Sequence, residues 1–388
     1  MYYLIAKKFL ASMNTTGKLT NVISVVGISL GSFALIISIS VLNGFENKLD
    51  EKISNFDGHL RISSSVSNDN LSKIKSLKVV KSVAINYERK GLINHLSNQS
   101  LVTFKQVNSS YFESFNEIPY FGALPSENEI LVGNDIASRL GVRKGDMVKI
   151  SSPLDKSFIL GFPPTLEVKV SGIFSSKILN YDSKYIIISE TIGKKLFSNS
   201  FENQFIDIRL NQSSKIDEAR VALSNIIGGE VISSWRDKNK VLVGAIKMEK
   251  IGSVVVLSLI LLVASFSILS TIYLVTIRKI KDFSILRFLG MTIDDVQRLI
   301  IYQSIIIGFK GSCIGFIAGF FIVLIQNIFK IISLPNDIYA MEVLPMVLSA
   351  GDVILILFIN IFFILSTGFY GARKFLKYDP MEILKWVK

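Results

Sequence analysis

The sequence contains only one cysteine and two histidines. Cys313 has no second thiol to pair with, so the chain forms no internal disulfide and its domains must be stable without one. His59 and His95 have no cysteine or acidic residue at the spacing of a metal site, so we expect both in ordinary strand or loop positions. This scarcity argues against a metal site and against a disulfide-bonded domain.

The chain also lacks the G-x-x-x-x-G-K-[ST] loop that cradles nucleotide phosphates. The two Gly-Lys pairs, Gly17-Lys18 and Gly193-Lys194, have neither the upstream glycine nor the following hydroxyl residue. No combination of nucleophile, base and orienting residue emerges either. We therefore expect a chain that is not an enzyme, that binds no cofactor of its own and that leaves any ATP chemistry to another protein.

Charge is missing from long stretches of the sequence. Hydrophobic residues make up 49% of the 388 residues, and the mean hydropathy of +0.46 is too high for an ordinary soluble protein. The uncharged runs are Leu19 to Phe45, Ile251 to Ile277, Gly311 to Phe329 and Val353 to Ala372. Each is long enough to cross a hydrocarbon core of about 30 Å, and in lipid each must be helical to satisfy its backbone groups.

The first run is expected to stay in the mature protein. It is about twice as long as the apolar region of a signal peptide, which has roughly 7 to 15 residues. The sequence at its end, VLNGFENKL, has no small-x-small cleavage pattern. We therefore interpret it as a membrane span.

Lysine and arginine are absent from the loop between Ile331 and Asp352, and this absence indicates the orientation of the chain. Lysine and arginine instead precede the first run, follow the last one and gather between 278 and 298. Because such residues resist translocation, both termini and the 278–298 loop are predicted to be cytoplasmic. Residues from about 46 to 250 are predicted to lie outside. This asymmetry explains most of the net charge of +12, so we expect no nucleic-acid partner.

The outer segment alternates apolar and polar residues in the manner of half-buried strands. The strand-like stretches are HLRIS, SLVTFKQV, DMVKIS, LEVKVSGIF, KYIIIS and FIDIRL. Asn134 is placed to cap a short helix that ends at Gly141, and Ser214 to Asp217 has the form of a capping box before another helix. The predicted fold is an α-helical membrane protein with four transmembrane helices and a large α+β periplasmic domain inserted between the first and second.

No proline occurs between Trp235 and Ile277. We therefore expect the second span to continue outward as a stalk helix. A stiff helix of this kind moves the outer domain whenever its cytoplasmic end moves.

The stretch between the second and third spans reads IRKIKDFSILRFLGMTIDDV. Ile280, Phe283, Leu286 and Leu289 form an apolar series, Gly290 is placed to end the helix, and Thr292 to Asp295 is a capping box for the next one. A basic amphipathic helix of this kind rests on anionic lipid in some proteins and docks a partner in others. Periodicity does not choose between the two.

Several stretches resemble ABC transporter permeases of the lipoprotein-releasing LolC/LolE family, which is related to the MacB and FtsX permeases. The clearest runs from Ser234 to Thr292, through the second span and the loop after it. The others are LIAKKFL near the amino terminus and the segments 27–49, 129–153, 170–189, 333–353 and 370–386. Together they cover nearly the whole chain in order.

The resemblance implies a permease of the bacterial inner membrane that extracts acylated lipoproteins and hands them to a periplasmic carrier. It also implies a second permease, identical or paralogous, and a dimer of a separate cytoplasmic ATPase that binds ATP and Mg²⁺. The 278–290 segment would be the coupling helix seated in that ATPase, with Phe283, Leu286 and Leu289 in its groove and Arg287 orienting them. Membrane lipid is a further expected contact.

Other positions carry finer expectations. Gly27 and Gly31 form a small-xxx-small pattern that allows close helix packing. By resemblance, Leu42 and Asn43 lie near the entrance of the lipoprotein cavity. The loop 153–164 resembles a hook that holds the carrier through Phe158, Ile159, Leu160 and Phe162, although these side chains could instead fold back on the domain's own core.

Two lysines depart from the family pattern. Lys310 lies within the third span and Lys177 in GIFSSKILNYD, and relatives usually carry small or apolar residues at the first position and small residues at the second. Two other functions also fit parts of the pattern. One is an FtsX-like regulator of a periplasmic hydrolase, and the other is a MacB-like exporter permease.

The expected organisation follows the chain in nine segments. They are a cytoplasmic amphipathic segment 1–18, the first span 19–45, the periplasmic domain with its stalk helix 46–247, the second span 248–277, the coupling loop 278–298, the third span 299–330, a short periplasmic loop 331–351, the fourth span 352–372 and a cytoplasmic tail 373–388.

Overall fold

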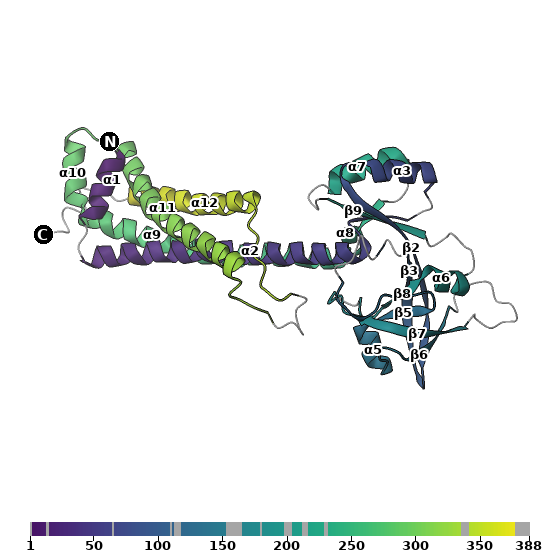
Figure 1. The fold of residues 1–388 in the computed structure, drawn as a ribbon. Coiled ribbons are helices and arrows are strands. Elements are labelled where there is room, and N and C mark those ends of the chain that lie inside the picture. The colour runs from purple at the N-terminus through teal and green to yellow at the C-terminus, as the bar shows by residue number, and fades with distance from the viewer. Residues whose placement is uncertain are drawn as a thin grey trace. The chain divides into compact units, whose positions relative to one another are not determined.

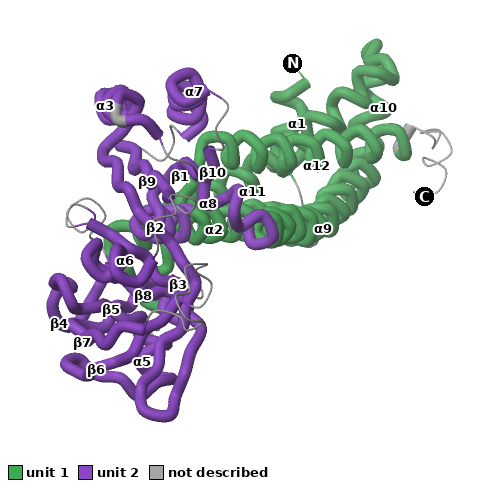
Figure 2. Tube along the Cα trace, turned by 90° about the vertical axis from the view of Figure 1, so that its right-hand side faces the viewer, with its two compact units in different colours: residues 1–46, 244–334, 342–388 green, residues 47–243, 335–341 purple. Residues whose placement is uncertain are grey.

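The computed structural model separates the chain into two compact units (Figure 2). The helical unit comprises residues 1–46, 244–334 and 342–388, and the sheet unit comprises residues 47–243 and 335–341. The residues that the structure describes are 2–12, 15–63, 66–108, 111, 118–152, 165–178, 181–197, 204–211, 216–228, 232–334 and 341–376.

Long helices dominate the helical unit (Figure 1). Its elements are α1 (Tyr2–Ala11), α2 (Thr15–Asp57), α9 (Lys240–Arg278), α10 (Ile280–Phe288), α11 (Ile293–Phe329) and α12 (Ala350–Leu376). Among the described residues, α2, α9, α11 and α12 are long and apolar enough to cross a membrane. They contain the four runs that the sequence predicts, although α2 and α9 continue well beyond the apolar residues.

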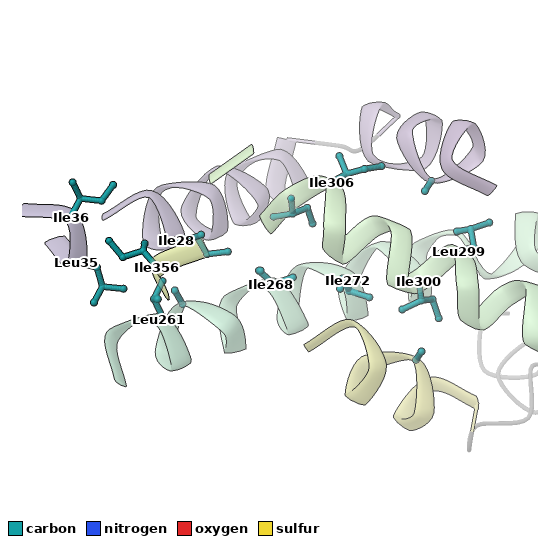
Figure 3. Close-up of a cluster of buried hydrophobic side chains, with 14 of the residues drawn as sticks. Ile28, Leu35, Ile36, Leu261, Ile268, Ile272, Leu299, Ile300, Ile306 and Ile356 are labelled. Atoms are coloured by element: carbon teal, nitrogen blue, oxygen red, sulfur yellow. The ribbon is translucent and has the colours of Figure 1, made fainter. Parts of the chain in front are cut away.

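The four long helices share one apolar core (Figure 3). Helix α2 contributes Ile28, Leu35 and Ile36, and α9, α11 and α12 contribute residues such as Leu261, Ile300 and Ile356. Glycines bring α11 close to α2, since a Cβ atom on Gly315 would lie 2.2 Å from the carbonyl oxygen of Ser29. Gly311 and Gly319, one turn away on either side, also face α2. Small residues at i, i+4 and i+8 therefore set the distance between these helices.

The described part of the sheet unit contains a ten-stranded mixed sheet. Its strand order is β10-β1-β9-β2-β3-β8-β5-β7-β4, and β6 pairs with β2 and β7. The strands are β1 (Leu60–Ile62), β2 (Val80–His95), β3 (Asn98–Val107), β4 (Tyr120–Gly122), β5 (Glu129–Gly133), β6 (Met147–Ser151), β7 (Thr165–Phe174), β8 (Tyr185–Ser189), β9 (Gln204–Leu210) and β10 (Ile232–Ser234). Its helices are α3 (Asn68–Ser76), α5 (Asn134–Leu140), α6 (Glu190–Leu196), α7 (Ile216–Ile227) and α8 (Trp235–Lys238).

Strand β2 connects two parts of the sheet. Its first half, from Val80 to Tyr87, pairs with β9, and its second half pairs with β6 at Leu92 to Asn94. One apolar core lies under α3 and α7 on the β9 side, and another lies under α5 and α6 on the β6 side. One long strand therefore links these two cores of the sheet unit.

The structure confirms the six strands predicted from alternation, adds four others, β2, β4, β5 and β10, and corrects two helix boundaries. Helix α5 is capped by Gly133 without a side-chain bond, so Asn134 is not its cap; Gly141 ends the helix in the left-handed region, with φ of 66°, as predicted. The proposed Ser214 cap lies outside the described residues. The stalk does not begin at Trp235, because α8 ends at Asn239, whose side-chain amide donates to the Trp235 carbonyl at 3.0 Å before α9 starts.

We predict that Gly315→Ala destabilises the helical unit by about 1–3 kcal/mol, the usual effect of overpacking, because the new methyl group meets backbone on α2. The measurement is the melting temperature of the purified chain in detergent. Gly252→Ala on α9 is the matched control, since no heavy atom lies within 4 Å of its added Cβ. Equal melting temperatures for the two variants would contradict the close packing of α11 on α2.

Candidate functional site

The turn between α9 and α11 is tightly defined. Gly290 follows α10 with φ of +97°, and its N–H donates to the carbonyl of Arg287. The Thr292 hydroxyl then donates to Asp295 Oδ2 at 2.7 Å, and the Asp295 N–H donates back to the Thr292 hydroxyl. The capping box and the glycine stop predicted from the sequence are both present, so α10 is a separate short helix between two long ones.

The two sides of α10 have different surroundings. Ile280 and Phe283 are buried in the core of the helical unit, and the ring of Phe283 meets the ring of Phe9 on α1 edge-on, with the ring centroids 5.2 Å apart. Phe288 and Leu289 are 89% and 79% exposed, and Ile285 is also exposed. The exposed apolar side chains of α10 therefore lie away from Phe283.

This arrangement corrects the predicted docking face. Residues three apart on a helix turn about 300°, so a series with that spacing drifts about 60° around the axis at each step. Phe283 and Leu289 therefore cannot share one face. Leu286 is half-buried, Arg287 is exposed, and Phe288, which the sequence reasoning missed, is the most exposed apolar residue of α10.

Helix α1 fixes both ends of the α10 loop. At one end Phe9 packs on Phe283, and Lys279 Nζ lies 5.9 Å from the centroid of the Phe9 ring. At the other end the hydroxyl of Tyr2 donates to Asp295 Oδ1 at 2.5 Å, which leaves Oδ2 for the capping box. The loop is therefore held by a helix that the sequence reasoning treated only as an amphipathic segment.

Within the sheet unit, the end of α2 is bonded to the helix that precedes α9. The indole N–H of Trp235 donates to Asp50, and Arg236 Nε lies 3.6 Å from the same carboxylate. Trp235 is 3% exposed and packs in a core with Ile53 and Phe56 of α2. Two of the chain segments that connect the units, α2 and the segment before α9, therefore share one anchor inside the sheet unit.

A buried charge network holds the last turn of α2 against the strands. The Arg61 guanidinium lies 2.8 Å from Asp57 and 2.5 Å from Asp207, and Lys105 Nζ lies 3.0 Å from Asp57. Burial opposes the charge on Arg61, but Asp207 and the other carboxylates outweigh it and keep the pKa of the guanidinium above its usual range. The carboxylates keep both cations charged and paired. Removing one partner of such a buried network costs about 3–5 kcal/mol, because an uncompensated charge remains.

The hydroxyl of Tyr111 belongs to the same cluster. It donates to the carbonyl of Phe56 in α2 at 2.8 Å. Burial raises the pKa of Tyr111 to about 12, so the phenol stays neutral and keeps its donor. The end of α2 is thus bound through its backbone as well as through Asp57.

A second polar cluster joins α2, α9 and α12 inside the helical unit, near the end of α9 that is far from α10. Lys250 Nζ donates to Asn43 Oδ1 at 2.8 Å and to Asp352 Oδ1 at 3.0 Å. The Asn43 amide donates to Asp352 Oδ2 at 2.6 Å, and the hydroxyl of Ser349 donates to the same oxygen. We call these four residues the clasp.

The clasp was not found from the sequence as a unit. Asn43 was predicted to lie near a cargo cavity, and the structure shows its amide engaged with Lys250 and Asp352, while Leu42 beside it is half-buried. One signal was available, because Ser349 and Asp352 have the spacing of a capping box at the start of the fourth apolar run. The partner Lys250 is far away in sequence, and only the fold brings it near.

The structure also describes the two glycines and the two lysines that the sequence singled out. Gly27 and Gly31 face α9, and a Cβ on Gly31 would lie 2.6 Å from Leu261 Cδ2. Lys310 is exposed on the surface of the helical unit. Lys177 adopts φ of +51° in a loop whose backbone N–H groups donate to Asp182, which explains why small residues suit this position.

The predicted hook residues Phe158, Ile159, Leu160 and Phe162 lie outside the described residues. Among the residues that are described, no group of three or more histidine, cysteine, aspartate or glutamate side chains could hold a metal ion. This arrangement supports mechanical roles. Helix α10 is a surface helix held by α1, and the long helices α2 and α9 are tied together in the sheet unit by the bond between Trp235 and Asp50.

Comparison with known protein families gives two matches. Residues 22–226 match the MacB-like periplasmic core domain, and residues 254–380 match the FtsX-like permease C-terminal domain. The first covers more than half of the chain and includes most of the sheet unit, and the second covers most of α9 and all of α10, α11 and α12.

Proteins similar over nearly the whole chain include three from two bacteria. The lipoprotein-releasing system transmembrane protein LolC of Neisseria meningitidis is 23% identical, over 99% of this chain and 97% of its own. LolC of Haemophilus influenzae is 26% identical over 97% and 95%, and LolE of the same organism is 24% identical over 93% of each chain. The similarity therefore extends over both units.

We predict that Lys250→Met destabilises the helical unit by about 1–3 kcal/mol, because Asp352, whose side chain is 8% exposed, loses a charged donor. The measurement is thermal unfolding in detergent. Lys247→Met is the matched control, since Lys247 is exposed on the same helix. Adding Asp352→Asn to Lys250→Met should recover part of the loss. Strictly additive effects of the two substitutions would contradict a stabilising contact between Lys250 and Asp352.

Proposed function

Because this chain belongs to the LolC/LolE family of ABC transporter permeases, we propose that it extracts acylated lipoproteins from the outer leaflet of the inner membrane and passes them to a periplasmic carrier. The observation that carries the proposal is the similarity to LolC and LolE over more than nine-tenths of the chain. The chain works with a second permease, identical or paralogous, and with a separate ATPase that binds ATP and Mg²⁺.

The proposed orientation places α10 and both ends of the chain in the cytoplasm and the sheet unit in the periplasm. Lysine and arginine follow the apolar part of α9 and of α12, whereas the loop between Ile331 and Asp352 has none. Short cationic loops resist translocation, so this distribution favours the proposed orientation. It also puts α10 on the side where ATP is available.

Lipoprotein extraction needs imported energy. Each acyl CH₂ group that leaves the bilayer costs about 0.8 kcal/mol, and an anchor with several acyl chains carries tens of these groups. Thermal release of such an anchor is therefore far too slow. An apolar cavity between paired permeases offsets part of the cost, and closure of that cavity by ATPase motion then expels the chains.

We propose that the ATPase docks on the exposed side of α10. Phe288, Leu289 and Ile285 form an apolar surface beside the exposed Arg287, which fits a groove with an acidic rim. Phe283 has a different role in this proposal: it anchors α10 on Phe9 of α1, so that a displacement of α10 moves the helices behind it.

Motion then passes along α9. This helix runs for 39 residues, from Lys240 to Arg278, and contains no proline, so it transmits displacement with little bending. In the sheet unit, the bond between Trp235 and Asp50 ties the segment before α9 to α2. These two connections to the sheet unit therefore move together.

Two further elements of the proposal concern cargo and carrier. Leu42 lies beside the clasp, near the end of the apolar part of α2, where acyl chains would enter from the outer leaflet. The loop that contains Phe158, Ile159, Leu160 and Phe162 follows β6 and is proposed to hold the carrier through these apolar side chains.

We predict that Phe288→Asp lowers co-purification of the ATPase at least about tenfold, because it places a charge in the centre of the docking surface. The measurement is the ATPase recovered with the tagged permease in detergent. Leu96→Asp is the matched control, since Leu96 is 93% exposed on the sheet unit. If Phe288→Asp retains the ATPase as well as the control does, this docking surface is wrong.

We predict that Leu42→Asp stalls lipoprotein release while the ATPase stays bound, because a carboxylate at the cavity entrance opposes entry of acyl chains. The measurement is lipoprotein release from spheroplasts to added carrier, followed over time and paired with co-purification of the ATPase. Wild-type release kinetics would remove Leu42 from the cargo path.

A further inference from the structure

A cleft of about 320 Å³ opens between α9 and α12, at the end of the helical unit that carries α10. From α9 it is lined by Leu269, Ser270, Ile272, Tyr273 and Thr276, and from α12 by Gly371 and Lys374. Leu269, Tyr273 and Thr276 are three or four residues apart, so they share one side of α9. The cleft lies wholly within the helical unit.

Gly371 helps to keep the cleft open. A side chain at this position would extend from α12 toward α9, and already its first carbon would lie 3.0 Å from Leu269 Cδ1. A larger residue at position 371 would therefore fill part of the cleft. The cleft is at the lower end of the size range of ligand pockets, roughly 300–1,000 Å³.

The lining of the cleft becomes more polar toward the end of α9. Leu269 is apolar and lies nearer the middle of α9, whereas Tyr273 and Thr276 approach its end at Arg278. Thr276 donates its hydroxyl hydrogen to the Ile272 carbonyl within its own helix, at 2.7 Å. The Ser270 hydroxyl likewise donates to the Phe266 carbonyl, at 3.0 Å. The donors left in the lining are therefore the ammonium group of Lys374 and the hydroxyl of the exposed residue Tyr273.

Lys374 has no carboxylate partner among the residues that the structure describes. It is exposed on the last turn of α12, and Arg278 is exposed at the matching end of α9. A cation above an apolar cleft in a membrane helix pair complements a ligand with an anionic head and an apolar tail. An ammonium headgroup, in contrast, finds no acidic side chain in the lining.

We propose that this cleft binds an anionic glycerophospholipid of the leaflet that adjoins α10. The lipid phosphate accepts hydrogen bonds from Lys374 and from the hydroxyl of Tyr273, and the first carbons of its acyl chains lie against Leu269 and Ile272. The bound lipid fills the gap between α9 and α12 directly behind the α10 loop. This site is distinct from the cargo path, which lies at the other end of α2 and α9.

The test is native mass spectrometry of the full-length permease, released from nanodiscs that contain equal amounts of phosphatidylglycerol and phosphatidylethanolamine. We expect phosphatidylglycerol to be retained preferentially. Lys374→Ala should lower that preference about tenfold, the effect of losing a charge-assisted bond, and Lys374→Arg should keep most of it. Gly371→Leu should reduce retention of both lipids, because it fills the cleft.

Arg373→Ala is the matched control. Arg373 is the neighbouring cation on α12, but its guanidinium lies 4.3 Å from the ring centroid of Phe369 and does not line the cleft. An equal loss of phosphatidylglycerol in Arg373→Ala and Lys374→Ala would indicate only a diffuse basic surface and would overturn the proposal. Equal retention of the two lipids by the wild-type chain would do the same.

The remaining alternative is that a second copy of the permease covers the cleft. A Ser270→Cys variant in a Cys313→Ser background tests it by oxidative crosslinking, since Ser270 also borders the cleft. Efficient crosslinking between two copies, with lipid retention unchanged in Lys374→Ala, would assign the cleft to permease pairing. Preferential phosphatidylglycerol binding without such a crosslink supports the lipid site.

Discussion

The structure depends on one constraint: a backbone that crosses hydrocarbon must satisfy every N–H and C=O group within itself. Helices meet this constraint, and nothing in α2 or α9 stops them where the apolar residues end, since neither contains proline. The two helices reach 43 and 39 residues, whereas about 20 suffice to cross a bilayer. Because of this excess length, α2 and α9 extend beyond the apolar residues as long, stiff helices. Contacts in each of the two units hold these helices in place.

The two units hold these helices by different means. In the helical unit, glycines allow close contact between helices, and hydroxyl groups such as that of Thr276 bond to their own helix, so little polar surface remains. In the sheet unit, the end of α2 is fixed by buried charges, with Arg61 and Lys105 between the carboxylates of Asp57 and Asp207. A charge network is tolerable there because every charge has a partner, and it resists bending in a way that apolar contact alone does not.

Much of this architecture could be predicted from the sequence. The four apolar runs, the alternation of six strands, the Thr292 capping box and the Gly141 stop are local patterns, and each appears in the structure. Four strands were missed: β2, β4, β5 and β10. The burial of β2 follows no clean alternation, because this strand borders different partners along its length. Asn134 was misplaced because strand β5 leads directly into α5, which makes Gly133 the capping residue.

The site was harder to predict for a physical reason. Which side of α10 is free depends on α1, nearly 300 residues away in sequence, and only their contact shows that Phe283 is covered and Phe288 is not. The clasp similarly joins Asn43, Lys250 and Asp352 from three helices. The cleft beside Lys374 arises from the spacing of α9 and α12, which no local pattern records.

The sheet has a property that matters when two such chains lie together. Within the described residues, the strands at the two ends of the strand order, β10 and β4, are each only three residues long. An edge this short offers few unpaired backbone groups to a neighbouring chain, so adjacent sheets have little opportunity to join into a continuous one. Crowded domains of this kind can then collide repeatedly on a membrane without aggregating through their edges.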